Sequence, residues 1–498
     1  MSETVAIVGA GICGLCTGLA LAKEDHRVTI YERDAPPPEG DADEAFFAWN
    51  RRGAAQFRHP HAFLAVMSNL LQESFPDLID DFWAAGARKI TIKDMLPLEL
   101  EDQYVPEPGD EKLWLLMCRR ATMETVLRRY AERSENLEIH SRVNVVDVIA
   151  DEQVDQLVVR GFRYLDADRN MRDIHADIVI DAGGRSSKFK EWLAARGATI
   201  ESEDDDAEIV YYTRHFQLLP GVEEPPRRGK ERSAGDLGYL KYGVFPGDGG
   251  HFALILCVPN DETELREAVK DGDKFDAICR SIPGLVRWVA EDKSKPTTAP
   301  FGFGDIHAVW HHFIHDGKPA ALNYFAVGDA ALRTNPLYGR GCSTGIIHAH
   351  LLAKLIGKVS DPLLRALTFD RWTEDELRPI FIASLSEDRR GIKRARAIRE
   401  GRALDRPESF KKWFGLAFGD AVAAATREDI HVMRGAMRTF NLMEKPGEFL
   451  NDWRTRLTIL RFMLRGRATN AKARIQHGPD RDRMLALVRS LDETNQAA

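Results

Sequence analysis

Long apolar runs, a dense set of cysteines and an excess of positive charge are all missing from this sequence of 498 residues. Without a run of about 18 apolar residues, no segment is expected to span a bilayer. Only six cysteines are scattered along the chain, which excludes a disulfide-stapled secreted domain and favours a reducing cytoplasm. The net charge of -8 and an isoelectric point near 6.1 give no overall attraction to nucleic acid or to anionic lipid, although they do not exclude local basic patches.

A basic leader is also missing before the first apolar stretch, residues 5–21, and glycines interrupt that stretch. We therefore expect a strand and a helix there rather than a signal peptide. The composition, 44% hydrophobic and 29% charged residues, is typical of a folded globular protein. The length allows two or three domains. Because the net charge attracts neither nucleic acid nor anionic lipid overall, small-molecule chemistry is the favoured class of function.

The first thirty residues carry a strand, a glycine turn, a helix and a second strand. Residues 4–8 form a short β-branched run, which predicts a buried parallel strand. The turn Gly9-Ala10-Gly11-Ile12-Cys13-Gly14 follows it, residues 12–23 predict a helix, and residues 27–31 predict the next strand. This is the βαβ unit that dinucleotide sites use.

Each glycine of this turn has a physical reason. Gly9 allows the tight turn, Gly11 lets backbone approach a pyrophosphate, and Gly14 lets the helix pack closely on the strand. The amides at the start of the helix then face the anion. Glu32 ends the second strand, where a carboxylate can accept hydrogen bonds from ribose hydroxyls. Taken alone, the turn predicts a dinucleotide site and fits NAD as well as FAD.

Two further segments lie between predicted strands and helices. The first follows a strand predicted at residues 178–181 and reads Asp181-Ala182-Gly183-Gly184-Arg185-Ser186-Ser187. The second follows another predicted strand and has two parts, Val327-Gly328-Asp329-Ala330-Ala331 and then Asn335-Pro336-Leu337-Tyr338-Gly339-Arg340-Gly341. Together with the opening turn, these segments resemble the FAD-dependent monooxygenases of the aromatic-hydroxylase-like superfamily.

The closest resemblance in motifs is to the bacterial polyketide epoxidase and hydroxylase branch. Its members have an early Arg-x-x-x-Gln-x-Arg-His-x-His-like stretch, which here runs from Arg52 through Gln56 to His61. The chain departs from the branch at Gly183, Arg340 and Cys342, where threonine, glutamine and a hydrophobic residue are common. These departures leave the expectation of flavin binding intact, and the resemblance is not extended to the exact function of the branch.

The resemblance implies which residues contact FAD. Arg120 would contact the pyrophosphate, because a guanidinium offers fixed donors to phosphate, and Val145 or Val146 would offer backbone groups to the adenine. The whole expected cofactor set is Gly9, Gly11, Gly14, Glu32, Arg33, Arg52, Gln56, Arg120, Val145, Asp181, Gly328, Asp329, Pro336, Gly339 and Gly341. Catalytic residues stay unassigned, with Arg214 as a candidate; sheet packing explains the neighbouring tyrosines equally well.

The expected fold is α/β: a Rossmann-like FAD-binding domain of the glutathione-reductase type, an inserted β-sheet substrate domain and a helical C-terminal extension. The FAD-binding domain would comprise residues 1–200 and 300–390, with 60–110 partly facing the substrate. Residues 201–299 would form the inserted sheet and 391–498 the helical region. In that last region, core packing is the expected role of Trp413, Phe414, Phe418, Trp453, Leu460, Phe462 and Leu464; a lid over the substrate and a dimer face are the alternatives.

The resemblance also implies the reaction. FAD, reduced by NADH or NADPH or supplied in reduced form by a separate reductase, would react with dioxygen to form a C4a-hydroperoxyflavin. This species would epoxidise or hydroxylate a small organic substrate, polyketide-like or isoprenoid-like. The chain has no second strand-glycine-helix unit that would bind a nicotinamide cofactor. A separate reductase is therefore an alternative source of reduced flavin. An oligomer is compatible with the sequence.

Three other functions remain open at this point. A flavin-dependent reductase of isoprenoid double bonds shares the scaffold. A flavin-dependent halogenase is disfavoured because the Gly-Trp-x-Trp-x-Ile-Pro signature is missing, and nothing supports a non-catalytic flavin-binding protein. We expect no metal: on a strand, His59 and His61 would lie on one face without further ligands. His311 and His312 add none, and the Cys13-Cys16 pair lies in the tight turn and its helix.

Overall fold

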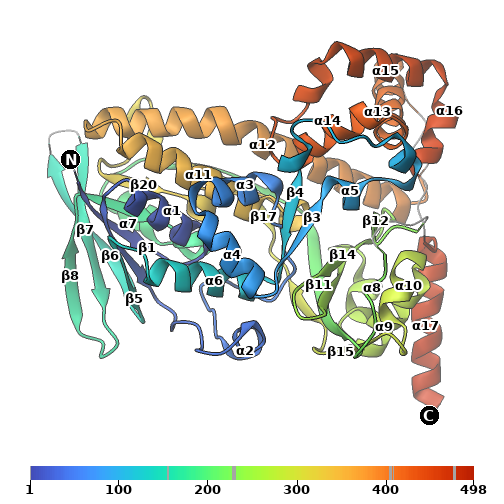
Figure 1. Ribbon diagram of the computed structural model, residues 1–498, viewed down its shortest axis with the longest axis horizontal. Helices are drawn as coiled ribbons and strands as arrows, with labels where there is room; N and C mark the ends of the chain where they lie inside the picture. Colours follow the sequence, from blue (N-terminus) through green and yellow to red (C-terminus); the bar gives the residue numbers. More distant parts are fainter. Residues whose placement is uncertain are drawn as a thin grey trace. The chain divides into compact units, whose positions relative to one another are not determined.

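The computed structural model describes residues 2–153, 156–226, 231–402, 407, 409–474 and 478–497. The chain divides into two compact units. Unit 1 comprises residues 1–87, 118–206 and 307–385, and unit 2 comprises residues 88–117, 207–306 and 386–498. Figure 1 traces the chain through the elements of both units.

A parallel sheet of five strands forms the centre of unit 1. The order across this sheet is β20 (Tyr324–Ala326), β9 (Ile178–Asp181), β1 (Thr4–Val8), β2 (Arg27–Glu32) and β5 (Leu137–Ser141). Val5, Ile7, Ile30, Ile178 and Ile180 are all buried. Such apolar strands are typical of a parallel sheet that is covered on both faces.

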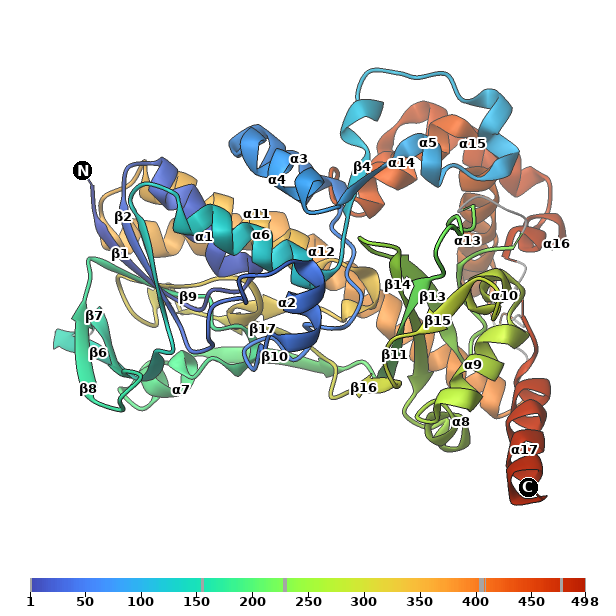
Figure 2. The same cartoon turned by 60° about the horizontal axis from the view of Figure 1, so that its bottom comes forward.

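Helices connect and cover these strands, and α1, α6 and α11 lie side by side (Figure 2). Helix α1 follows the glycine turn and packs closely, because a Cβ at Gly18 would lie 2.8 Å from Ile30 Cδ1. The helices of unit 1 are α1 (Ile12–Lys23), α2 (Ala42–Ala48), α3 (Ala65–Ser74), α4 (Pro76–Ala84), α6 (Arg120–Glu132), α7 (Phe189–Ala194) and α11 (Gly341–Ile356).

Smaller antiparallel sheets complete unit 1. The three-stranded sheets are β6 (Asn144–Gln153), β7 (Gln156–Leu165) and β8 (Met171–His175), and β10 (Glu201–Asp206), β17 (His307–His312) and β21 (Leu332–Arg333). A short hairpin pairs β18 (Ile314–His315) with β19 (Lys318–Pro319). Strand β10 is a strongly acidic run, in which exposed and half-buried side chains alternate from Ser202 onward.

Unit 2 contains a larger antiparallel sheet. Its order is β12 (Ala234–Asp236), β13 (Lys241–Pro246), β14 (His251–Pro259), β11 (Ile209–Leu218) and β15 (Ser294–Pro296), with β16 (Phe301–Phe303) also pairing β11. Helices α8 (Thr263–Ala268), α9 (Gly272–Ser281) and α10 (Pro283–Val289) follow β14. A hairpin of β3 (Arg88–Thr91) and β4 (Trp114–Met117) and the short α5 (Ile92–Met95) also belong here.

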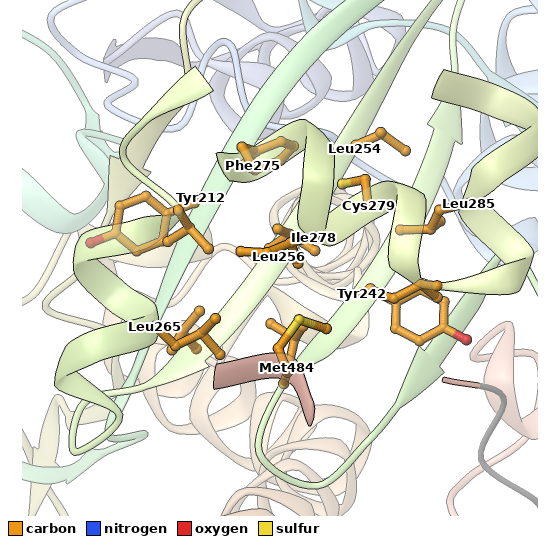
Figure 3. Close-up of a cluster of buried hydrophobic side chains, with 14 of the residues drawn as sticks. Tyr212, Tyr242, Leu254, Leu256, Leu265, Phe275, Ile278, Cys279, Leu285 and Met484 are labelled. Carbon is orange, nitrogen blue, oxygen red and sulfur yellow. The ribbon is translucent and has the colours of Figure 1, made fainter. Parts of the chain in front are cut away.

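The core of unit 2 lies between this sheet and its helices. Figure 3 shows Leu254 and Leu256 of β14 facing Phe275 and Ile278 of α9. Met484, which belongs to the last helix α17 (Arg481–Ala497), is completely buried in the same cluster. The C-terminal helix is therefore part of this core.

The rest of unit 2 is helical, as expected for the C-terminal region. Helix α12 (Pro362–Arg399) begins in unit 1 and ends in unit 2. It is followed by α13 (Phe410–Glu428), α14 (Ile430–Phe440), α15 (Trp453–Leu464) and α16 (Arg467–Asn470). The short 3-10 helices of the chain are η1 (Leu98–Gln103), η2 (Asp110–Lys112), η3 (Gly184–Ser186), η4 (Gly328–Ala330), η5 (Pro336–Tyr338), η6 (Glu448–Asn451) and η7 (Ala471–Arg474).

The prediction of core packing is wrong for most of the C-terminal aromatic and leucine residues. Phe418 and Phe462 do pack against the buried cluster of α13, α14 and α15. The others are exposed: Trp413 by 42%, Phe414 by 47%, Trp453 by 66%, Leu460 by 53% and Leu464 by 81%. Helical spacing gives the same pattern for an inward and an outward apolar face, so spacing alone could not separate them.

The predicted fold class is confirmed, because unit 1 is an α/β domain with the expected strand, glycine turn and helix. The bounds of β1, α1 and β9 match the residues predicted for them. The expected division into FAD-binding, inserted and C-terminal domains stays a prediction, because compactness does not show where a cofactor or substrate binds.

Candidate cofactor site

The candidate motifs meet at one edge of the parallel sheet. Val8, at the end of β1, pairs with Asp181 of β9 and with Tyr31 of β2, and Asp181 pairs with Ala326 of β20. All three neighbouring strands therefore end at the same level as β1. In open parallel sheets, ligands bind in the crevice outside the carboxyl ends of the strands.

The glycine turn after β1 is tightly packed at two of its glycines and open at the third. Gly9 has a φ of +105°, and its amide donates to the Tyr31 carbonyl at 2.8 Å. A Cβ at Gly9 would lie 2.5 Å from the Ala182 carbonyl oxygen, and a Cβ at Gly14 would overlap the Gly9 carbonyl oxygen. At Gly11, by contrast, a Cβ would meet nothing within 4 Å. Gly9 and Gly14 thus serve the fold, whereas Gly11 borders open space at the start of α1.

Glu32 lies beside this turn and is almost completely buried. Its Oε2 accepts the Ala10 amide at 2.8 Å and lies 3.1 Å from Nη1 of Arg51, and its Oε1 accepts the Asp34 amide at 2.9 Å. A carboxylate offers about four acceptor positions. Glu32 therefore holds the turn and retains a position on Oε1 for a further donor.

Arg51, which the sequence did not single out, is the centre of a buried ionic cluster. Its guanidinium contacts Glu32, Asp34 at 3.1 Å and Glu124 of α6 at 2.9 Å. Burial would lower the pKa of Arg51, but the carboxylates, Glu124 first, outweigh burial and raise it. The predicted site residue Arg52 is its exposed neighbour. A turn containing two adjacent arginines gives no signal as to which one is buried.

Arg120 is the first residue of α6 and extends the same cluster. Its Nε donates to Glu124 at 2.6 Å, and its Nη1 lies 2.9 Å from Nε2 of His61. Burial would raise the pKa of Glu124, yet Arg120 and Arg51 outweigh it and hold that pKa below its usual value. Glu124 is therefore a buried carboxylate that stays ionised between two arginines.

Three helices begin around Arg120. Gly11 is the N-cap of α1, Arg120 begins α6 and Gly341 begins α11. Arg120 interacts electrostatically with Cys342 on the first turn of α11 and with Asp329. Helix N-termini carry partial positive charge and unsatisfied amides, so their convergence with a guanidinium favours an anion.

The cysteines at these helix starts have raised pKa values. Burial raises the pKa of Cys13 to about 12 and that of Cys342 to about 11. Thiolate is the nucleophilic form, so both side chains stay neutral and uncharged at neutral pH. Cys13 packs next to Gly328 and Gly345, and its thiol donates to the Gly345 carbonyl at 3.4 Å.

Asp181 organises the loop that follows β9. Its Oδ1 accepts the Gly183 amide at 2.9 Å, and its Oδ2 accepts the hydroxyls of Ser187 at 2.5 Å and Tyr324 at 3.1 Å. Burial raises the pKa of Asp181 to about 6, although these hydrogen bonds oppose the rise. The loop therefore depends on an Asp181 carboxylate that protonates in mildly acidic solution.

The segment after β20 packs against the start of α1. Gly328 has a φ of +59°, and a Cβ there would lie 2.9 Å from Sγ of Cys13. The Gly328 amide donates to Nδ1 of the buried His348 at 3.3 Å. Asp329, which follows, is half-buried; burial raises its pKa, and Arg120 opposes this. Gly328 thus holds Asp329 at the helix starts.

The segment Asn335–Gly341 is a tight turn before α11. Asn335 is buried and accepts the Leu337 amide at 3.0 Å, which caps η5 with Pro336 at its start. Gly339 has a φ of +65°, and a Cβ there would lie 2.8 Å from Ala62 Cβ. Gly341, like Gly11, would place a Cβ in open space. Arg340 points to α12, where it donates to Ser384 at 2.6 Å.

The other expected cofactor residues lie around this site or at its margin. Arg33 follows Glu32 and donates to the Arg52 carbonyl at 2.8 Å. Gln56 is half-buried in the turn after Arg51, and its carbonyl accepts the His59 amide. Val145 lies in β6, next to a bulge in the β6–β7 pairing, and packs against the apolar cluster around Phe162. Contacts of these residues with FAD stay a prediction.

Arg214 lies in unit 2 and is held by neighbouring groups. Its Nη1 forms an ion pair with Asp276 of α9 at 2.7 Å and donates to the Gly272 carbonyl, and its Nε donates to the Thr298 carbonyl at 3.1 Å. These contacts tie β11 to α9. Its role as a catalytic residue stays a prediction.

Histidines that might have suggested a metal have other partners. His59 and His61 lie in the loop before α3 rather than on a strand, and His61 Nδ1 lies 2.8 Å from the His59 carbonyl oxygen. His311 contacts Ser202, and His312 contacts Glu203, both across the β10–β17 pairing. Within the described ranges, no group of three or more His, Cys, Asp or Glu side chains has a geometry that could hold a metal.

Over the same ranges, no helix has the length and apolar character to cross a membrane.

Residues 4–201 match the family model described as FAD dependent oxidoreductase. Protein Rv3254 of Mycobacterium tuberculosis (strain ATCC 25618 / H37Rv) is 29% identical over 232 residues, which cover 43% of this chain and 45% of that protein. The chain thus aligns with less than half of that relative. Kynurenine 3-monooxygenase of Stenotrophomonas maltophilia (strain K279a) is 22% identical, with coverage of 72% of this chain and 73% of the relative.

Solved structures extend the likeness of fold over most of the chain. The flavin-dependent brominase Bmp2 superposes with a TM-score of 0.61 at 13% identity, covering 93% of this chain and 99% of that one. OxyS anhydrotetracycline hydroxylase from Streptomyces rimosus has a TM-score of 0.55 at 16% identity, covering 89% and 76%. Residues 4–201 thus resemble the FAD dependent oxidoreductases, and the turns at the carboxyl ends of the strands agree with an α/β FAD-binding fold.

Proposed function

We propose that this chain is a flavoprotein monooxygenase that uses reduced FAD and dioxygen to hydroxylate or epoxidise a small organic substrate. The observation that carries the proposal is the convergence of three glycine-containing turns with the starts of α1, α6 and α11 at one edge of the parallel sheet. The relative named kynurenine 3-monooxygenase, aligned over 72% of this chain, supports oxygen transfer as the reaction class.

The residues at this edge fit FAD. Gly11 and the first amides of α1 would bind the pyrophosphate, since Gly11 leaves open space there. Glu32 would accept a ribose hydroxyl on Oε1, and Arg120 would balance the phosphate charge. Bound FAD supplies two-electron redox chemistry and, once reduced, the activation of dioxygen.

The chain's own residues set the charge around this site. Arg51 and Arg120 share Glu124, so the cluster holds two guanidiniums in fixed positions without placing an unpaired cation in the interior. A preorganised guanidinium loses little freedom when it binds phosphate. His61 stays neutral, because burial lowers its pKa well below the usual value, and so it accepts from Arg120 and keeps that side chain in place.

For the substrate, we propose a planar aromatic or polyketide-like molecule, and an isoprenoid-like one as the alternative. The support comes from relatives whose names specify kynurenine and anhydrotetracycline. We propose NADH or NADPH as the electron donor, with a separate flavin reductase as the alternative source of reduced flavin. A cytoplasmic location and an oligomeric state stay predictions.

The proposal is tested by oxygen incorporation. FAD-loaded protein is incubated with NADH or NADPH under ¹⁸O₂ together with kynurenine, anhydrotetracycline or a small panel of related phenols, and products are analysed by mass spectrometry. We expect at least one compound to stimulate NAD(P)H oxidation and to gain a single ¹⁸O atom. Protein stripped of FAD is the control.

Two results would count against a monooxygenase. One is anaerobic addition of two hydrogens to an alkene substrate with no oxygen gained, which would identify a reductase. The other is a halogenated product that appears only when bromide or chloride is added. The isolated protein could also oxidise neither nicotinamide and yet become active when a separate reductase supplies reduced FAD. That result would identify a separate flavin reductase as the source of electrons.

A further inference from the structure

Helix α15 in unit 2 carries an apolar stripe on its outer face. Trp453, Leu457, Leu460 and Leu464 are exposed by 66%, 43%, 53% and 81%. Their spacing of four, three and four residues places them on one side of the helix. Large side chains this exposed are normal when scattered singly, whereas a contiguous stripe indicates a binding surface.

The opposite face of the same helix fixes its orientation. Thr455 and Ile459 are buried, and Phe462 packs against the cluster that includes Ala421 and Ala425 of α13. Figures 1 and 2 both show α15 beside α13 in the helical part of unit 2. Because the inner face is already packed, α15 cannot turn its outer stripe inward without giving up this core.

Arginines flank the stripe on both sides. Helical spacing places Arg454 and Arg461 along one edge and Arg456 along the other. No aspartate or glutamate lies between Trp453 and Leu464. Arg454 lies over the Trp453 ring, and Arg456 donates to the Leu450 carbonyl and Asn451. In the part of the chain that the structure describes, Arg454, Arg456 and Arg461 form no ion pair with a carboxylate.

The flanking charge decides between two occupants of this face. A second copy of the chain pairing through the same stripe would bring arginine flanks against arginine flanks, and like charges beside a helical seam oppose pairing. An anionic lipid surface offers the opposite charge together with an apolar layer. Tryptophan and leucine on one face with arginine at the edges is the pattern of helices that lie in the bilayer interface.

We propose that this face of α15 binds the surface of a bilayer rich in anionic phospholipid, with Trp453, Leu457, Leu460 and Leu464 entering the headgroup region. Arg454, Arg456 and Arg461 contact the phosphates, and their aliphatic stems lie along the apolar layer. The first turn of α13, which exposes Phe410, Trp413 and Phe414, supplies a second apolar cluster in the same unit. The binding is peripheral and does not depend on the proposed reaction.

Co-sedimentation of the full-length, FAD-loaded protein with vesicles tests this proposal. We expect binding to vesicles of equal parts phosphatidylcholine and phosphatidylglycerol, little binding to phosphatidylcholine alone, and a decrease as salt is raised. The double substitution Trp453→Ser with Leu464→Ser should weaken the partition coefficient about tenfold. Arg454→Glu with Arg461→Glu should remove the preference for the anionic vesicles.

The matched control is Met171→Ser, which removes a side chain of similar exposure, 55%, from β8 of unit 1. It should bind vesicles as the wild type does, and circular dichroism should show that all variants are folded. Equal sedimentation of the wild type and of the Trp453→Ser, Leu464→Ser variant would overturn the proposal. So would a wild-type dimer in light scattering that Leu464→Ser converts to monomer, with no vesicle binding by either.

Discussion

Replacing Gly11 by aspartate should abolish tight FAD binding without weakening the fold. A Cβ at Gly11 meets nothing within 4 Å, and the residue has an extended backbone (φ −75°, ψ 178°) that aspartate adopts easily. It is also the N-cap of α1, where aspartate is a favoured residue. The new carboxylate would, however, occupy the space that we assign to the pyrophosphate.

We therefore expect opposite effects on affinity and stability. The FAD dissociation constant should rise about a hundredfold or more, because like charges held together at a binding site cost several kcal/mol. The melting temperature of the FAD-free protein should stay the same or rise slightly. Fluorescence titration with FAD measures the first quantity, and differential scanning fluorimetry of the stripped protein measures the second.

Gly415→Asp is the matched control, because Gly415 is exposed on α13 and a Cβ there also meets nothing within 4 Å. It should leave FAD affinity unchanged. Gly14→Ala gives a second contrast, since its Cβ would overlap the Gly9 carbonyl oxygen and should destabilise the apoprotein. Normal FAD affinity in Gly11→Asp would show that the pyrophosphate does not lie at this turn.

The second large effect concerns Glu124. The substitution Glu124→Gln keeps the shape of the side chain but removes the charge that Arg51 and Arg120 share at 2.9 and 2.6 Å. Two buried guanidiniums would then lose a common partner, and breaking a buried ionic cluster in this way typically costs about 3–5 kcal/mol of unfolding free energy. Chemical denaturation of the variant and the wild type measures the loss.

Glu132→Gln is the matched control on the same helix. Glu132 pairs with Arg128 at 2.6 Å, but its side chain is 42% exposed, so its loss should cost less than about 1 kcal/mol. Equal losses at Glu124 and Glu132 would contradict the buried cluster as a source of stability.

The same cluster predicts a dependence on pH. The folded-state pKa of Glu124 is lowered, because Arg120 and Arg51 outweigh the opposing effect of burial. The stabilisation is therefore complete above the unfolded-state pKa of about 4.3 and is lost as the pH falls towards the lower folded-state value. Wild-type stability should fall more steeply than that of Glu124→Gln on acidification through this window. Parallel acid profiles would contradict the ionised state of Glu124.

Local features of the chain could be predicted where a spaced residue type, such as glycine, fits only one kind of local structure. The strand, glycine turn and helix at residues 4–23 are such a case, since Gly9 needs a positive φ and Gly14 needs close packing. The loop of Asp181 and the turn before α11 lie where the motifs placed them. Their shared edge follows from the parallel pairing of β1, β9 and β20.

Features that depend on pairing across the fold were not predictable in this way. Arg51, Asp34 and Glu124 are polar residues from three separate segments, and no local pattern indicates that they meet in the interior. The outer stripe of α15 is a different case. Its helix is apolar on two faces, so periodicity alone suggested packing for residues such as Trp453 and Leu464, which the structure leaves exposed.

The central claim is that the carboxyl edge of the unit 1 sheet binds FAD. Titration of the purified, cofactor-free protein with FAD, and separately with NADH, NADPH and FMN, tests it most directly. We expect one equivalent of FAD to bind tightly, with a change in the flavin absorbance bands, and the nicotinamides to bind far more weakly. A protein that binds no FAD, or that binds a nicotinamide tightly and FAD not at all, would contradict the claim.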